Sequence, residues 1–202
     1  MKKRKQLAAL GCMAVICLTG CGAAKVPEAI ETSTVVVTEK GKITAHLVAD
    51  FDKTYYDMSE LMTMAKEEAE EFNSSKLSSD EKPVVVEQAE LLDNSRIKLT
   101  YQFDSWETYT EFNEGKLFFG TVNEAAEEGY LSGATLKSVR DGSTMTEEQL
   151  KQDGDRKMII TDADADIYCP GKVIYISEGA AVNEDGSVAA AQADGLVYIL
   201  MK

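Results

Sequence analysis

Apolar and polar residues alternate strictly in the segment that follows the turn signal Asp93-Asn94-Ser95. The apolar members of this alternation are Ile97, Leu99, Tyr101 and Phe103. Because successive side chains of a β-strand point to opposite faces, a period of two gathers these residues on one face. We therefore predict that residues 84–103 form two antiparallel strands with one buried face. A chain that contains this ribbon needs an apolar core on that side.

Strand signals recur along the rest of the chain. Residues 34–48 contain two β-branched runs joined through Lys40-Gly41, a pattern typical of a hairpin. A further turn is predicted at Asp185-Gly186. Other strands are predicted at residues 117–119, 134–139, 157–161, 172–177 and 196–201.

Three helices are predicted from residues that can cap a helix N-terminus. Asp57 with Glu60, and Thr121 with Glu124, have the spacing of a capping box, and Ser105 is the third capping candidate. The predicted helices cover residues 57–72, 105–113 and 121–129. Many hairpin-spaced strands and a few short helices predict an α+β fold, in which the helices pack on a mainly antiparallel sheet.

The N-terminus has the order of features found in export signals, namely basic, then apolar, then small. Residues 2–5 are basic, residues 7–18 form an apolar stretch, and Gly20 is the small residue. The apolar stretch is too short to span a bilayer. We therefore predict that residues 1–20 are a signal peptide that is removed on export.

The run Leu18-Thr19-Gly20-Cys21 resembles the lipobox of bacterial lipoproteins, and this resemblance covers residues 1–21. It implies that a diacylglyceryl group is attached to the sulfur of Cys21 and that cleavage occurs before this residue. The protein would then be held on the extracytoplasmic face of a cell membrane. Gly22 in place of aspartate implies the outer membrane of a double-membrane bacterium, or the outer face of the plasma membrane where there is only one.

The mature chain is long enough for one domain. Removal of residues 1–20 from 202 leaves 182 residues, which can bury a sizeable core. Residues 21–33 are mostly small or polar and lack periodicity, so we predict a flexible tether behind the lipidated Cys21. Residues 34–202 are predicted to form a single α+β domain.

Charge limits the partners of this domain. The chain has 21 basic and 35 acidic residues, and the signal removes four basic ones, which leaves 17 against 35 and a formal charge of −18. Such a charge repels phosphate backbones and anionic headgroups. We therefore expect no nucleic acid partner, and contact with the membrane only through the lipid on Cys21. Cations and basic partners remain compatible with this charge.

Cysteine and histidine usage excludes several kinds of site. Cys12 and Cys17 leave with the signal and Cys21 is lipidated, so Cys169 has no partner for an internal disulfide. The fold must therefore rely on its apolar core. Cys169 lacks a CxxC pattern and a nearby histidine, and we predict a buried small hydrophobe. The single histidine, His46, excludes a His-rich zinc centre and is predicted to be structural.

The segment Asp50-Phe51-Asp52-Lys53-Thr54 follows a predicted strand and resembles the DxDxT motif of haloacid-dehalogenase-like phosphatases. The resemblance implies that Asp50 is the nucleophile, that Asp52 is the general acid/base, and that Mg²⁺ bridges the site. That family has a parallel, doubly wound sheet, whereas residues 84–103 predict an antiparallel one. Because of this difference, we expect a binding function and keep the phosphatase as the alternative.

Three aspartates alternate with small residues later in the chain, at Asp162, Asp164 and Asp166. In an extended strand their carboxylates would share one face, roughly 7 Å apart. In a loop they could ligate Ca²⁺, although Ile167 and Val173 stand where an EF-hand needs glycine and glutamate. The sequence leaves two interpretations open, a Ca²⁺ or Mg²⁺ site and a solvated acidic face.

The layout of the chain is similar to that of small lipoproteins of Gram-positive anaerobes. The shared features are the lipobox, an acidic α+β domain, and Pro170-Gly171-Lys172 before a strand that contains tyrosine. This resemblance carries no known activity. We expect a non-enzymatic lipoprotein, without a resident cofactor, that binds a partner or ligand at the cell envelope. The alternatives are the phosphatase on Asp50 and Asp52, and a structural or assembly lipoprotein with no small ligand.

Overall fold

The structure is a computed structural model that describes residues 24–53, 55–76, 82–190 and 195–202. The predicted signal peptide, residues 1–20, and the predicted lipidation site, Cys21, lie outside these residues. Within the described ranges no helix is long and apolar enough to cross a membrane.

The first sheet has seven strands in the order β11-β12-β9-β1-β2-β4-β3. In that order their bounds are Ala180–Val182, Val188–Ala190, Ala165–Tyr168, Thr34–Val37, Ile43–Asp50, Arg96–Phe103 and Val84–Leu91. Neighbouring strands pair antiparallel except β1 and β9, which are parallel. The β1-β2 hairpin turns at Gly41, whose φ of 77° is a left-handed conformation that glycine adopts without strain.

The second sheet has six strands in the order β5-β8-β13-β10-β6-β7, all paired antiparallel. In that order their bounds are Leu117–Thr121, Lys157–Thr161, Val197–Met201, Val173–Ser177, Thr135–Ser138 and Thr144–Thr146. The predicted α+β fold on mainly antiparallel sheet is therefore confirmed.

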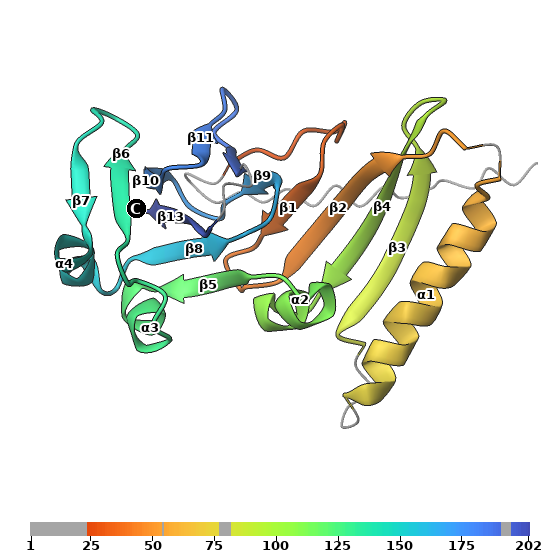
Figure 1. Ribbon diagram of the computed structural model, residues 1–202, viewed down its shortest axis with the longest axis horizontal. Coiled ribbons are helices and arrows are strands. Elements are labelled where there is room, and N and C mark those ends of the chain that lie inside the picture. Colours follow the sequence, from red (N-terminus) through yellow and green to blue (C-terminus); the bar gives the residue numbers. More distant parts are fainter. Residues whose placement is uncertain (1–23, 54, 77–81, 191–194) are drawn as a thin grey trace, which may run out of the picture.

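Four α-helices and one 3₁₀ turn are described. They are Met58–Ser75 (α1), Trp106–Asn113 (α2), Val122–Glu127 (α3), Glu147–Leu150 (α4) and Lys151–Asp153 (η1). Figure 1 shows α1 alongside β3 at one end of an elongated molecule, with β6, β7 and α4 at the other end.

The three predicted helices begin where the sequence predicts. The Asp57 carboxylate accepts hydrogen bonds from the backbone N–H groups of Ser59 and Glu60 at 2.8 and 2.9 Å. Thr121 and Glu124 form the reciprocal capping box at the start of α3. These bonds satisfy N–H groups that have no partner inside a first helical turn.

One apolar core joins the two sheets. It contains Val37 and Leu99 from the seven-stranded sheet, Ile159 and Ile199 from the six-stranded sheet, and Ala65 from α1. Since the side chains of a strand alternate between faces, the same strands of the six-stranded sheet supply a second core on their other face.

This second core lies under α3 and α4. It contains Met158, Ile160 and Leu200 from the sheet, with Ala125 from α3 and Leu150 from α4. The six-stranded sheet is thus apolar on both faces in its central strands.

The flexible tether predicted for residues 21–33 does not extend as far as Ser33. Ile30 is only 5% exposed, and the guanidinium of Arg96 donates to the carbonyl of Glu31. The prediction of a free segment is therefore wrong from Ile30 onward, because one apolar side chain among polar neighbours is enough to attach the chain to the domain. Residues 24–29 are mostly exposed.

Candidate functional site

A cavity of about 620 Å³ lies in the seven-stranded sheet next to the first residue of β1. Strand β1 starts at Thr34, which pairs with His46 of β2 on one side and with Asp166 of β9 on the other. Strand β2 continues beyond this level to Asp50, so the strands on either side of β1 border a gap. The cavity in this gap is lined by Glu31, Thr32, Ser33, Val48, Ala49, Asp50, Arg96, Asp164, Ala165, Asp166 and Ala190.

Hydroxyl groups of the segment before β1 form the floor of this gap. The hydroxyl of Ser33 accepts a hydrogen bond from the backbone N–H of Val48 at 3.1 Å. The hydroxyl of Thr32 donates to the carboxylate of Asp166 at 3.1 Å. The Ser33 hydroxyl thus replaces part of the backbone ladder that a longer β1 would make with β2.

Charges of both signs line the cavity. Its carboxylates belong to Glu31, Asp50, Asp164 and Asp166, and its cationic group is Arg96. Arg96 is fixed from two directions, since its Nε donates to Asp93 at 2.8 Å and its terminal nitrogen donates to the Glu31 carbonyl at 3.1 Å.

In the turn before β4, the pKa of Asp93 is lowered and the pKa of Arg96 is raised. Hydrogen bonds from the backbone of Ser95 and from Arg96 lower the pKa of Asp93 to about 2. The hydrogen bond to Asp93 and the nearby charges of Asp93, Glu31 and Asp50 raise the pKa of Arg96. Arg96 therefore remains a cation at the rim throughout the physiological pH range.

A hydrogen-bond network supports the Asp166 side of the cavity. The amide of Asn183 donates to Asp166 at 3.1 Å and to the hydroxyl of Ser187 at 3.0 Å. The same Ser187 hydroxyl donates to Asp185, which also accepts from the Tyr168 hydroxyl at 2.9 Å. Burial, followed by the bond to Asp185, raises the pKa of Tyr168 to about 12. Tyr168 is thus a neutral donor that fixes the turn beside the cavity.

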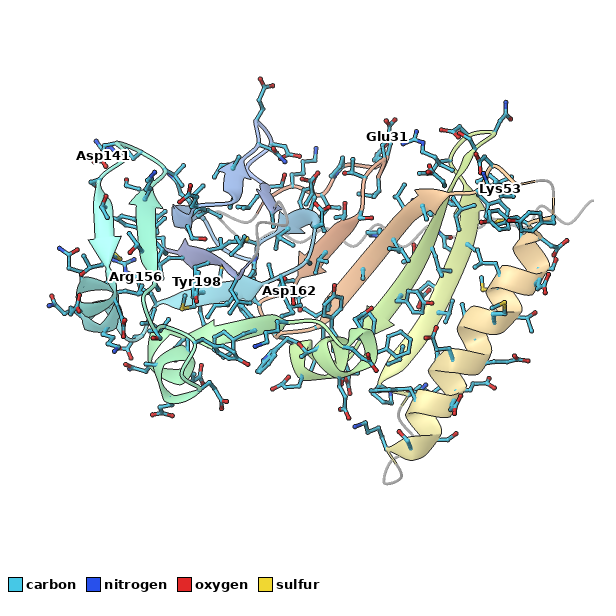
Figure 2. The ribbon with its side chains drawn as sticks, viewed as in Figure 1. Glu31, Lys53, Asp141, Arg156, Asp162 and Tyr198 are labelled. Carbon is cyan, nitrogen blue, oxygen red and sulfur yellow. The ribbon has the colours of Figure 1, made fainter. Side chains whose placement is uncertain are left out.

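The two acidic segments singled out in the sequence meet at this cavity, but only in part. Asp50 from the first segment lies across from Asp164 and Asp166 of the second. Asp52 points elsewhere, and its carboxylate pairs with Lys53 at 3.1 Å in an exposed loop. Asp162 accepts a hydrogen bond from the backbone N–H of Lys116 at 2.8 Å, beside β5. Figure 2 shows Asp162 far from Glu31 at the cavity rim.

The three alternating aspartates therefore do not line one cavity together, since Asp164 and Asp166 line it and Asp162 does not. Strand β9 begins only at Ala165, so Asp162 and Asp164 lie outside the paired strand to which Asp166 belongs. Among the described residues no three histidine, cysteine, aspartate or glutamate side chains come together in an arrangement that could hold a metal ion. The donor set does not fit the Ca²⁺ or Mg²⁺ site that the sequence suggested.

The phosphatase resemblance meets the same difficulty. Asp50 lies at the end of β2, as a strand-end nucleophile would, but β2 pairs antiparallel with both of its neighbours. The family that carries the DxDxT motif has a parallel sheet, in which catalytic residues gather at one edge. Asp52 does not line the cavity with Asp50. These residues do not fit a Mg²⁺-bridged aspartyl-phosphate site.

The single histidine and the free cysteine have structural surroundings. Nδ1 of His46 lies 3.1 Å from the Thr100 hydroxyl on the neighbouring strand. Burial and the charge of Lys98 lower the pKa of His46, while Glu90 opposes them. Cys169 is 2% exposed, and burial raises the pKa of its thiol to about 12. The prediction that Cys169 is a buried hydrophobe is confirmed.

Two charged cavity residues were not identified from the sequence, Glu31 and Arg96. Glu31 was assigned to the tether, and its position follows from the burial of its neighbour Ile30. Arg96 directly follows the predicted turn at Asp93, and its spacing of three residues from this aspartate was an available signal for an ion pair. Comparison with protein-family models, with curated proteins and with solved structures gives no match to this chain.

Proposed function

We propose that this protein is a non-enzymatic lipoprotein, anchored through Cys21 on the extracytoplasmic face of a cell membrane, that binds a partner or ligand at the cell envelope. The observation that carries the proposal is the run Leu18-Thr19-Gly20-Cys21 after a basic and apolar N-terminus. The position of the folded domain supports it, since the first buried side chain among the described residues is Ile30, nine residues after Cys21.

The cavity at the end of β1 is the proposed binding site. Support comes from its size of about 620 Å³ and from its charges, which combine several carboxylates with the fixed guanidinium of Arg96. A ligand with a cationic group beside a hydrogen-bond acceptor would match these charges. A binding role is favoured over catalysis because Asp50 lines the cavity without Asp52, its proposed acid/base partner, and neither His46 nor Cys169 lines it.

Lipid anchoring is tested by replacing the proposed attachment residue. The variant Cys21→Ser should remain unprocessed or enter the aqueous phase in detergent phase separation, whereas the wild-type protein should enter the detergent phase. The variant Cys17→Ser is the matched control, because it removes a thiol from the apolar part of the signal and should be processed and retained as wild type. Membrane retention of a cleaved Cys21→Ser product would contradict the proposal.

The cation alternative is tested by thermal unfolding of the mature protein with EDTA, Ca²⁺ or Mg²⁺ at matched ionic strength. A specific site filled to about 100 times its dissociation constant adds roughly 2.7 kcal/mol, a rise of about 5 to 10 °C for this length. We expect a change of less than about 2 °C, because the aspartates do not come together. A larger rise with one ion would restore the metal site and direct the next assay to phosphoester hydrolysis.

A further inference from the structure

Lysines gather around one cavity of this acidic protein, away from the proposed binding site. A cavity of about 820 Å³ is lined by Lys157, Lys172 and Lys202, with Phe119 and Met201 among the apolar residues between them. All three lysines are exposed. In a mature chain with 17 basic and 35 acidic residues, three lysines on one cavity form a local exception to the overall charge.

The turn between β1 and β2 extends this basic surface. Its Glu39 lines the same cavity, and the exposed Lys40 and Lys42 follow directly. The turn is held against the cavity wall, since Gly41 lies against Phe119, where an added Cβ would be 3.7 Å from the ring. We call the five lysines the lysine face: Lys40, Lys42, Lys157, Lys172 and Lys202.

Few carboxylates neutralise the lysine face. Among the described residues, Glu39 is the only acidic one that lines the cavity, and Glu124 reaches Lys157 at 3.8 Å. None of the ion pairs within the described ranges involves Lys40, Lys42, Lys172 or Lys202. By contrast, α1 at the other end of the molecule carries Glu67, Glu68, Glu70 and Glu71.

The chain enters the domain beside this face. The backbone N–H of Ala24 donates to the carbonyl of Cys169 at 3.4 Å. The next two residues, Pro170 and Gly171, line the lysine cavity, and Lys25 is exposed. Cys21 is three residues before Ala24, and three residues span at most about 11 Å in any conformation. A lipid on Cys21 would therefore emerge next to the lysine face.

We propose that the lysine face docks on the anionic phospholipid headgroups of the membrane that holds Cys21, so that the anchored domain has a fixed orientation. The proposal rests on the lipid anchoring argued above. A lysine near an anionic surface contributes about 1 kcal/mol, roughly a fivefold preference. The remaining surface is acidic and is repelled, so the lipid and the lysines together select one orientation. The overall charge led to the opposite expectation, because it does not report how lysines are distributed.

The orientation can be measured by energy transfer from a fluorophore on the protein to a lipid-headgroup acceptor. The lipidated full-length product is reconstituted into phosphatidylcholine vesicles with or without phosphatidylglycerol. The fluorophore is attached through Lys40→Cys on the lysine face or through Lys53→Cys, which Figure 2 places beside α1 at the far end of the molecule. Cys169 is buried with a pKa of about 12, so the introduced thiol is the one that reacts.

We expect stronger transfer from residue 40 than from residue 53, and a difference that grows with phosphatidylglycerol and disappears in 1 M NaCl, where screening reduces the Debye length to about 3 Å. The variant Lys172→Glu/Lys202→Glu should lower the preference for this orientation by at least about 25-fold. The matched control Lys66→Glu/Lys137→Glu makes the same change in net charge at exposed lysines elsewhere and should have little effect.

Two results overturn the proposal in distinguishable ways. Equal transfer from both labels, or no response to phosphatidylglycerol, on vesicles that carry the protein would overturn docking and leave the lipid anchor intact. A product that does not float with vesicles of either composition would contradict the anchor itself, and the docking inference that depends on it would fall as well.

Discussion

The two sheets differ in what their strands can be used for. In the six-stranded sheet, β8 and β13 bury consecutive residues, such as Ile159, Ile160, Ile199 and Leu200, because apolar cores lie on both faces. In the seven-stranded sheet, β4 also buries consecutive residues, but its apolar core residues alternate with polar ones such as Lys98 and Thr100. A strand with two apolar faces can contribute only to stability. A strand with one polar face can also contribute hydrogen-bonding and charged groups to a site.

The largest expected difference between the sheets is in the free energy of unfolding lost when a leucine of each sheet is replaced. Leu200 of β13 is 0% exposed, whereas Leu47 of β2 is 52% exposed. Leu200→Ala should lower the free energy of unfolding by about 2 to 5 kcal/mol through lost burial and a new cavity, and Leu47→Ala by less than about 1 kcal/mol. Chemical denaturation measures both values. Equal losses from the two variants would remove the distinction between the sheets.

A smaller effect is expected at the helix that covers the six-stranded sheet. Thr121→Ala removes the hydroxyl that accepts from the Glu124 backbone N–H at 3.1 Å at the start of α3. Loss of such a cap costs about 1 kcal/mol, a fall of about 2 to 4 °C in the unfolding midpoint. Thr135→Ala, at an exposed position of β6, is the control and should change stability by less than about 0.5 kcal/mol. The same unfolding midpoint in Thr121→Ala and Thr135→Ala would show that the Thr121 cap does not stabilise α3.

The polar face of the seven-stranded sheet should show a weak dependence on pH. Burial and Lys98 lower the pKa of His46, so the unfolded chain takes up a proton near pH 6.5 before the folded chain does. The contribution of His46 to stability is thus present above pH 6.5 and is lost as the pH falls from 6.5 toward the lower folded pKa. Denaturation between pH 7.5 and 5.5 should show this slope in the wild-type protein and a flatter one in His46→Gln. The same slope in both would assign it to other groups.

The cavity residue Asp50 should have the smallest effect on stability. It is exposed and makes no side-chain hydrogen bond within the described residues, so Asp50→Asn should change the free energy of unfolding by less than about 0.5 kcal/mol. Neither the wild-type protein nor the variant should release phosphate from a panel of phosphoesters with Mg²⁺. Magnesium-dependent release that disappears in Asp50→Asn would instead establish the phosphatase alternative.

Local signals in the sequence predicted much of the fold. The hairpin at Gly41, the ribbon about Asp93 and the caps at Asp57 and Thr121 all depend on neighbouring residues. Strand β9 was missed because its parallel partner β1 lies some 130 residues earlier, and no local pattern encodes such a pairing. Helix α4 was missed although Thr146 and Gln149 have capping-box spacing, which was an available signal.

The candidate site was less predictable than the fold. The sequence identified Asp50 and Asp166 separately, but their meeting depends on where β1 begins between β2 and β9. That start is set by Ser33, whose hydroxyl replaces a backbone partner of Val48. The alternation of aspartates left a strand and a loop open at residues 162–166, and of the three aspartates only Asp166 belongs to β9.

The intact mass of the protein extracted from membranes tests the central proposal most directly. The account predicts a chain that begins at Cys21 and carries the added mass of a diacylglyceryl group. A chain that retains residues 1–20, or one that begins at an unmodified Cys21, would contradict lipid anchoring and remove the basis for membrane docking through the lysine face.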